Sequence, residues 1–160
     1  MKYYDKIAKS YNELYEKEQL EKVNIILKHI KPKGKLLDIG AGTGISTKLF
    51  EKYCKCIALD PSKELLKQYN GKKILAKAEK LPFKDKTFDV IISVTALHHM
   101  NIRKALKEIF RVAKSDSQIA LTILKKSELA KTIEKEGLFK DFKKIDSKKD
   151  WIFIKTNQTY

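Results

Sequence analysis

The sequence contains few cysteines and no long apolar stretch. Its two cysteines, Cys54 and Cys56, have no further thiols to complete a structural metal site, so no metal centre is expected. No apolar run approaches the roughly 20 residues that a membrane-spanning helix needs. The first residues also lack the apolar centre of a signal peptide. These absences predict a protein of the reducing cytoplasm with no membrane partner.

Arginine is also scarce, although the formal net charge is +15. Only Arg103 and Arg111 are arginines, so nearly all the positive charge comes from lysine, and it is spread along the chain. No arginine cluster marks a surface that reads bases or phosphates. Two interpretations stay open: attraction to a polyanion such as RNA, or a lysine-rich surface that is merely hydrated.

The chain of 160 residues has no linker, repeat or low-complexity tract, so one domain over residues 1–160 is expected. Apolar residues at helical spacing predict a helix over residues 3–30. The segment 16–21, polar except for Leu20, leaves room for a bend or for two helices. We expect residues 1–31 to form an N-terminal helical cap and residues 32–160 to form a cofactor-binding α/β core.

Short apolar runs alternate with helical patterns through the rest of the chain, which predicts a parallel sheet with helices on both faces. The last two runs would form a hairpin around the charged turn 146–150 and make one strand antiparallel. The expected strands are residues 36–39, 56–60, 73–76, 88–93, 118–124, 142–145 and 151–154, and the expected helices are 45–50, 62–69, 103–114 and 127–137.

A glycine-rich loop follows the first strand, with the sequence LLDIGAGTG. A dinucleotide site would have the pattern GxGxxG, whereas Gly40, Gly42 and Gly44 form GxGxG. Asp38 precedes the loop and would repel a pyrophosphate, but it suits a ligand with a cationic end, such as S-adenosylmethionine. A tight turn without any ligand is the alternative.

The second strand ends in an acid, Asp60, which lies 18 residues beyond Gly42. In nucleotide-binding βαβ units an acid at about this separation binds the ribose hydroxyls. Asp60 followed by Pro61 is also a good helix start, with aspartate as the N-cap and proline at the first helical position.

Taken together, these segments resemble the seven-stranded S-adenosylmethionine-dependent methyltransferases. The similarity is to the branch that contains the ubiquinone and menaquinone biosynthesis methyltransferases and several tRNA methyltransferases. It rests on YYDKIAKSYN, LLDIGAGTG, ALDPS, AKAEKLPFKDKTFDVIIS, TALHH and LFKDFKKIDSKKDWIFIKTN. The resemblance implies a Rossmann-like three-layer sandwich with a mostly parallel seven-stranded sheet and a C-terminal antiparallel hairpin.

The resemblance also implies the residues of the site. Lys77 stands where the family has an aspartate that contacts adenine, and lysine offers no acceptor, so either Glu79 substitutes or the contact is lost. His98 and His99 follow the fourth strand, where they would position the acceptor or take its proton, or merely pack the turn. The implied cofactor-binding residues are Tyr11, Asp38, Gly40, Gly42, Gly44, Asp60, Pro61, Ala78, Glu79 and Ser93.

One departure and one similarity after the fourth strand bear on the acceptor. The chain lacks the Asn-Pro-Pro-Tyr type of motif after the fourth strand, and its segment 93–99 is similar to that of wobble-uridine tRNA methyltransferases. We expect an acceptor in RNA, such as tRNA, and as a further partner a small zinc-binding activator protein. The alternatives are a small-molecule acceptor such as a quinone and, last, a non-catalytic cofactor-binding subunit.

Overall fold

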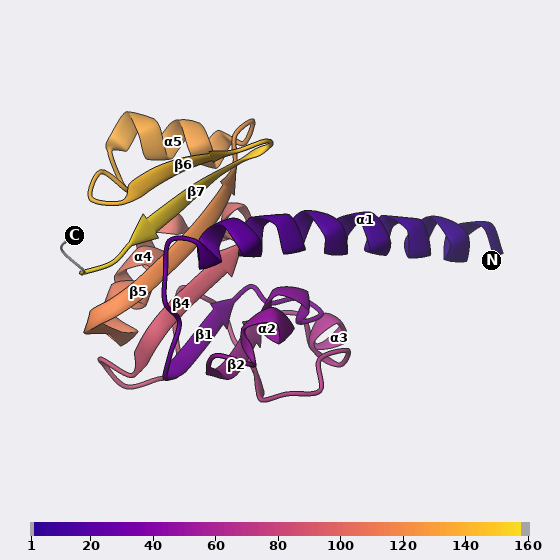
Figure 1. Ribbon diagram of the computed structural model, residues 1–160, viewed down its shortest axis with the longest axis horizontal. Helices are drawn as coiled ribbons and strands as arrows, with labels where there is room; N and C mark the ends of the chain where they lie inside the picture. The colour runs from indigo at the N-terminus through magenta and orange to yellow at the C-terminus, as the bar shows by residue number, and fades with distance from the viewer. Residues whose placement is uncertain (1, 158–160) are drawn as a thin grey trace.

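The computed structural model describes residues 2–157, with side chains from residue 12 onward. Its first element is α1 (Lys2–Leu27), a single helix without a bend. The polar segment 16–21 consists of glutamate, lysine, glutamine and leucine, all good helix formers, so the helix continues through it. Figure 1 shows that only the C-terminal part of α1 covers the sheet, while its N-terminal part extends beyond it.

Seven strands form one sheet in the order β3-β2-β1-β4-β5-β7-β6. β7 runs antiparallel to both of its neighbours, and the pairs from β3 to β5 are parallel, which confirms the expected fold class. The strands are β1 (Lys35–Ile39), β2 (Lys55–Asp60), β3 (Lys73–Leu75), β4 (Phe88–Val94), β5 (Ala113–Leu124), β6 (Lys143–Ser147) and β7 (Asp150–Lys155).

Helices cover the two faces of the sheet in two groups. A core of buried residues joins α1 and α2 to one face, and α3 packs through Leu66 against Ala58 on the same side. A larger core joins α4 and α5 to the opposite face. The helices after α1 are α2 (Ile45–Phe50), α3 (Lys63–Leu66), the 3-10 turn η1 (Leu97–His99), α4 (Ile102–Val112) and α5 (Glu128–Glu136).

Several element boundaries differ from expectation. The helix expected over 3–30 ends at Leu27, and three other differences are larger or change the neighbouring element. The helix expected over 103–114 ends at Val112, because Ala113 already pairs with Phe88 of β4 and thereby begins β5 well before residue 118. The helix expected over 62–69 ends at Leu66, since Tyr69 turns inward and is only 1% exposed. The expected charged turn 146–150 narrows to two residues, and Asp150 opens β7.

The strand order places the site. Because the connections reverse direction between β1 and β4, the loops after these two strands diverge at the carboxyl edge of the sheet. Such a switch point is where open α/β sheets bind ligands. Within the described residues, no helix is long and apolar enough to cross a membrane.

Candidate active site

The loop between β1 and α2 turns back across the end of β2. The backbone amides of Gly40 and Ala41 both donate to the carbonyl oxygen of Leu59, at 2.8 and 3.0 Å. Since β1 and β2 are parallel neighbours, these bonds hold the loop over the carboxyl ends of both strands. The loop therefore stands at the edge of the sheet where a ligand is expected.

Two glycines of this loop serve different purposes. Gly44 has a φ of 84°, and a Cβ added there would lie 2.3 Å from the Tyr69 ring, so packing excludes a side chain. Gly42 has a φ of 57°, yet the nearest atom to an added Cβ is Leu65 Cδ1 at 4.0 Å. The space beside Gly42 is open, and a ligand can approach the backbone there.

Asp38 lies beneath the loop and is only 1% exposed. Its Oδ2 accepts a hydrogen bond of 2.7 Å from the Thr47 hydroxyl on α2. Burial raises the pKa of the Asp38 carboxyl to about 7, and the charge of Asp60 raises it further, while the bond from Thr47 opposes the shift. A cationic group bound nearby would favour the ionised carboxylate.

Asp60 links the loop to the segment after β2. Its Oδ2 accepts from the Gly42 amide at 2.9 Å and its Oδ1 accepts from the Ser62 amide at 2.8 Å. The helix-cap alternative for Asp60 was wrong, because the Ser62 hydroxyl caps α3 by accepting from the Leu65 amide. A carboxylate has about four acceptor positions, so Asp60 keeps capacity for two hydroxyl donors.

A cavity of about 550 Å³ opens in front of the loop. It brings together Gly42, His98 and His99, which are far apart in the sequence and belong to the predicted site. Residues of α1 and β7 complete its wall. The lining residues are Asn12, Tyr15, Glu16, Glu18, Lys22, Gly42, Thr43, Ile45, Leu65, Gln68, Thr95, His98, His99, Leu124, Lys149 and Asp150.

His98 and His99 form the turn η1 directly after β4, with ring centroids 4.9 Å apart. His99 is exposed, whereas His98 is half-buried and its Nδ1 has no hydrogen-bond partner within the described residues. Burial lowers the pKa of His98, helped by His99 and Lys22 and opposed by Asp150. His98 is therefore neutral at neutral pH and can accept a proton.

A buried polar network beside His98 was not found from the sequence. Lys22 Nζ on α1 lies 3.0 Å from Asp150 Oδ2 and donates to Thr95 Oγ1 at 2.7 Å. Thr95 Oγ1 is also 2.9 Å from Thr122 Oγ1. Thr95 has a φ of 57°, which is strained for a β-branched residue. The network joins α1, β5, β7 and the residue after β4 at the inner wall of the cavity.

Other predicted cofactor residues lie behind the cavity or away from it. Ser93 is fully buried and donates from Oγ to the Ile39 carbonyl at 2.8 Å. Glu79 Oε1 accepts from the Asn101 amide at 2.8 Å, which ties the loop after β3 to the start of α4. Ala78 is buried in the larger core. Their contacts with a cofactor remain predictions.

Pro61 and Tyr11 complete the predicted set, and Lys77 is the departure from the family pattern. Pro61 and Lys77 are exposed, and neither lines the cavity. The Tyr11 side chain falls outside the described residues. Among the residues that the structure does describe, no group of three or more His, Cys, Asp or Glu side chains could hold a metal ion.

The donor set around the loop fits S-adenosylmethionine. The buried acid Asp38 matches the ammonium group of this cofactor. The open backbone at Gly42 leaves room for its methionine chain, and the free acceptor positions of Asp60 match the two ribose hydroxyls. Two carboxylates at the loop would oppose a pyrophosphate. The chemistry of these side chains thus favours a cationic nucleoside over a dinucleotide.

Comparison with known sequences agrees with this geometry. The model of the family described as "Methyltransferase domain" matches residues 37–121. The uncharacterized protein MJ1252 of Methanocaldococcus jannaschii is 41% identical over 150 residues, which cover 89% of this chain and 58% of that protein. A demethylmenaquinone methyltransferase of Corynebacterium urealyticum is 36% identical over 97 residues, covering 58% of this chain and 42% of that enzyme.

Solved structures share the fold. A S-adenosylmethionine-dependent methyltransferase of Thermotoga maritima superposes with a TM-score of 0.73 at 19% identity, covering 97% of this chain and 98% of that one. A putative methyltransferase of Haloferax volcanii, in complex with the Trm112 methyltransferase activator, superposes with a TM-score of 0.66 at 18% identity. The match covers 72% of this chain and 57% of that one. This chain spans about half the length of the curated relatives above. It belongs to the S-adenosylmethionine-dependent methyltransferases of the methyltransferase-domain family.

Proposed function

We propose that the protein transfers the methyl group of S-adenosylmethionine to an acceptor in RNA. The observation that carries this proposal is the shared cavity, in which the open glycine loop faces His98 and His99 across about 550 Å³. One side of the cavity suits the cofactor and the other remains open for an acceptor. RNA is the acceptor class that best suits the net charge of +15.

The glycine loop, the two acids beside it and His98 each have a role in this proposal. Asp38 faces the ammonium of the cofactor, Gly42 lets its methionine part approach the backbone, and Asp60 accepts from the ribose hydroxyls. S-adenosylmethionine supplies a methyl group already activated by the sulfonium. The chain must then hold an acceptor atom in line with that methyl group. His98, neutral at pH 7, takes a proton where the acceptor has one to lose.

Lysines near the cavity mouth support an anionic acceptor. Lys149 lines the cavity, and a neighbouring hollow of about 260 Å³ adds Lys17 and Lys148, whereas Lys22 is already paired with Asp150 at the inner wall. Lys148 and Lys149 pair with Glu21 and Glu18 of α1, at 3.0 and 3.5 Å, through largely exposed lysine side chains. Such exposed pairs are weak and exchange readily with phosphates.

A small-molecule acceptor is the second candidate. It is supported by the similarity over 97 residues to the demethylmenaquinone methyltransferase. A small activator subunit belongs to the proposal as well, because the similar Haloferax methyltransferase is in complex with a methyltransferase activator. A small-molecule acceptor predicts no methyl transfer to RNA, and a required activator predicts transfer to RNA only when the activator is present.

Discrimination among RNAs tests the proposal. Binding of the protein to one tRNA is compared with binding to an unrelated RNA of equal length at about 0.15 M salt, where the screening length is about 8 Å. A steep salt dependence alone reports only charge. Preference for the tRNA, with methyl transfer to it, supports the proposal. Equal weak binding and no transfer, with or without cell extract, would favour the small molecule, whereas transfer that requires extract would indicate an activator.

A further inference from the structure

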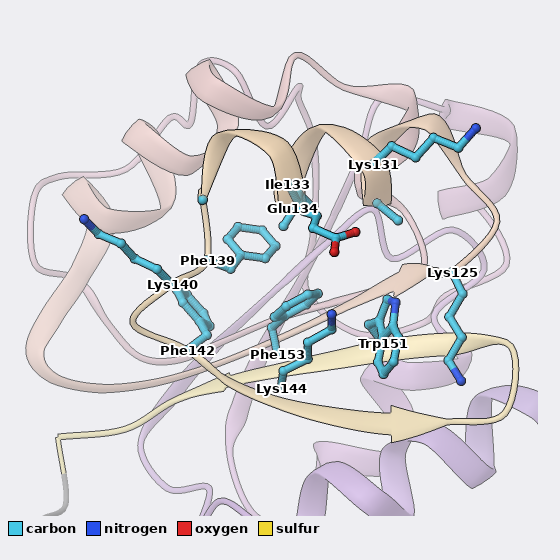
Figure 2. A pocket seen from close by; sticks show the side chains of 12 residues that line it. Lys125, Lys131, Ile133, Glu134, Phe139, Lys140, Phe142, Lys144, Trp151 and Phe153 are labelled. Carbon is cyan, nitrogen blue, oxygen red and sulfur yellow. The ribbon is translucent and has the colours of Figure 1, made fainter.

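A second cavity, of about 320 Å³, lies between α5 and the β6–β7 hairpin, apart from the glycine loop (Figure 2). Its floor consists of phenylalanine rings. Phe139 stacks edge-on against Phe153 with centroids 4.8 Å apart, and its centroid is 5.1 Å from that of Phe142. All three rings are buried, so the floor is a fixed apolar surface. We refer to this cavity as the α5 groove.

Trp151 forms one wall of the α5 groove, between two lysines. Lys144 Nζ lies 4.0 Å and Lys125 Nζ 4.5 Å from the centre of its indole, and Figure 2 shows them on either side of the ring. Lys125 is held by an ion pair with Asp146. Lys144 is exposed and makes no ion pair within the described residues, so it can leave the ring without losing a carboxylate partner.

The rim of the α5 groove is cationic. Four lysines line it against a single acid, Glu134. Lys131 pairs with Glu128 at 3.1 Å, whereas Lys140, like Lys144, has no ion-pair partner among the residues described. An aromatic floor below a rim of free ammonium groups suits a ligand that joins a flat ring to a negative charge.

The α5 groove adjoins the candidate active site. Leu124 lines the active-site cavity, and the next residue of the chain, Lys125, lines the α5 groove. The Lys125 amide donates to the carbonyl of Lys149, another active-site lining residue, at 2.9 Å. The end of β5 and the turn after β6 therefore form a common border between the two cavities.

We propose that the α5 groove binds one nucleotide of a single-stranded RNA segment, next to the nucleotide held in the active site. The base packs on Trp151 and the phenylalanine floor, and the adjoining phosphates pair with Lys140 and Lys144. This proposal rests on the RNA acceptor proposed above and gives it a second point of attachment. An acidic peptide would use the lysines but leave the aromatic floor unused.

Trp151 provides a direct readout, because it is the only tryptophan of the chain. Its fluorescence is followed while a single-stranded oligonucleotide of about eight residues is added at about 0.15 M salt. A base stacked on the indole should quench the emission to a saturating value. Polyphosphate and polyglutamate, which carry negative charge but no bases, should leave most of the Trp151 emission unquenched. Equal quenching by polyglutamate would overturn the proposal.

Charge-matched variants locate the binding. Lys140→Glu with Lys144→Glu changes two exposed rim lysines, and Lys52→Glu with Lys55→Glu makes the same change of net charge at exposed positions outside both cavities. Lys52 Nζ lies 5.1 Å from the Tyr53 ring centre, so the control also removes a lysine–aromatic contact. We expect the groove variant to lose roughly tenfold more affinity for labelled oligonucleotide than the control. Equal losses would contradict the proposal.

A conservative change separates stacking from folding. Trp151→Phe keeps an aromatic wall and should retain most of the affinity, while Trp151→Ala should lose roughly tenfold, with unfolding transitions checked for both. If tRNA is methylated equally well by wild type and by the Lys140/Lys144 variant, the groove assignment fails and the RNA acceptor stands. If the oligonucleotide quenches Trp151 but only a small molecule is methylated, the groove assignment stands and the RNA acceptor falls.

Discussion

Lys22 on α1 and Asp150 on β7 form a buried ion pair, with the ammonium nitrogen 3.0 Å from the carboxylate and side chains only 11% and 4% exposed. The pair lies at the inner wall of the active-site cavity and, through Thr95, touches the end of β4. It joins the N-terminal helix to the sheet beside the site, and α1 supplies part of the cavity lining. Loss of the pair should therefore affect both stability and acceptor binding.

Lys22→Ala leaves the Asp150 charge buried without its partner. We expect the free energy of unfolding to fall by about 3 kcal/mol, the lower end of the range for breaking a buried pair, because the cavity admits water. Denaturant unfolding measures this. Lys148→Ala, which removes an exposed pair with Glu21, is the control and should change little. A comparable loss in the control would show that Lys22 and Asp150 are no more important than a surface pair.

Asp60→Ala should weaken binding of S-adenosylmethionine by about 1.5–3 kcal/mol, the range for hydrogen bonds to a charged group. Calorimetric titration measures the change. Ser62→Ala is the matched control, because it removes the α3 cap and keeps the Ser62 amide that donates to Asp60. If Ser62→Ala weakens cofactor binding as strongly, Asp60 acts by shaping the segment after β2 and not by binding ribose.

Asp38 should make stability depend on pH in the absence of the cofactor. Its pKa of about 7 in the folded protein lies above the ordinary 3.8, so folding favours the neutral carboxyl. The resulting stability is complete below pH 3.8 and is lost as the pH rises through about 7. The expected slope is at most about 1.4 kcal/mol per pH unit.

Asp38→Asn removes this titration and keeps an acceptor for Thr47. Unfolding is measured for both proteins between about pH 5 and pH 8, and the difference between them isolates the Asp38 contribution. We expect the wild type to lose stability relative to the variant as the pH rises. A difference that is constant over this range would contradict the burial of an ionisable Asp38.

His98 should produce an acidic limb in the pH profile of methyl transfer. Burial lowers the pKa of His98 below 6.5, so its imidazole is still mostly neutral at pH 6.5 and gains a proton only at lower pH. kcat/KM should fall in that range, and His98→Gln should remove the limb and slow transfer while cofactor affinity is kept. His99→Gln, at the exposed neighbour, should retain the limb. An unchanged limb in His98→Gln would exclude His98 as the proton acceptor.

The sequence predicted the order of elements because each rests on local pattern. Apolar runs between helical segments indicated the parallel strands, and the two-residue turn at Lys148 and Lys149 closes the hairpin that was expected. The spacing of Asp38, Gly42 and Asp60 likewise predicted residues that the structure brings together at one loop. These signals lie within about 22 residues of one another.

Polar contacts between residues far apart in the chain could not be predicted from local sequence patterns. Lys22 and Asp150 are 128 residues apart, and Asp150 stood in a segment expected to be a charged turn. One signal was available, because Lys22 shares a helix face with the buried Ile26, four residues on. The positive φ of Thr95 had no signal, since β-branched residues rarely adopt it.

The central claim is that the acceptor is RNA, and the fate of a labelled methyl group tests it most directly. The protein is incubated with labelled S-adenosylmethionine and a whole-cell extract, and the product is divided into ribonuclease-sensitive, protease-sensitive and solvent-extractable label. We expect ribonuclease-sensitive label that disappears with Asp60→Ala and persists with Lys52→Glu. Label that is extractable into organic solvent and resists ribonuclease would contradict the account.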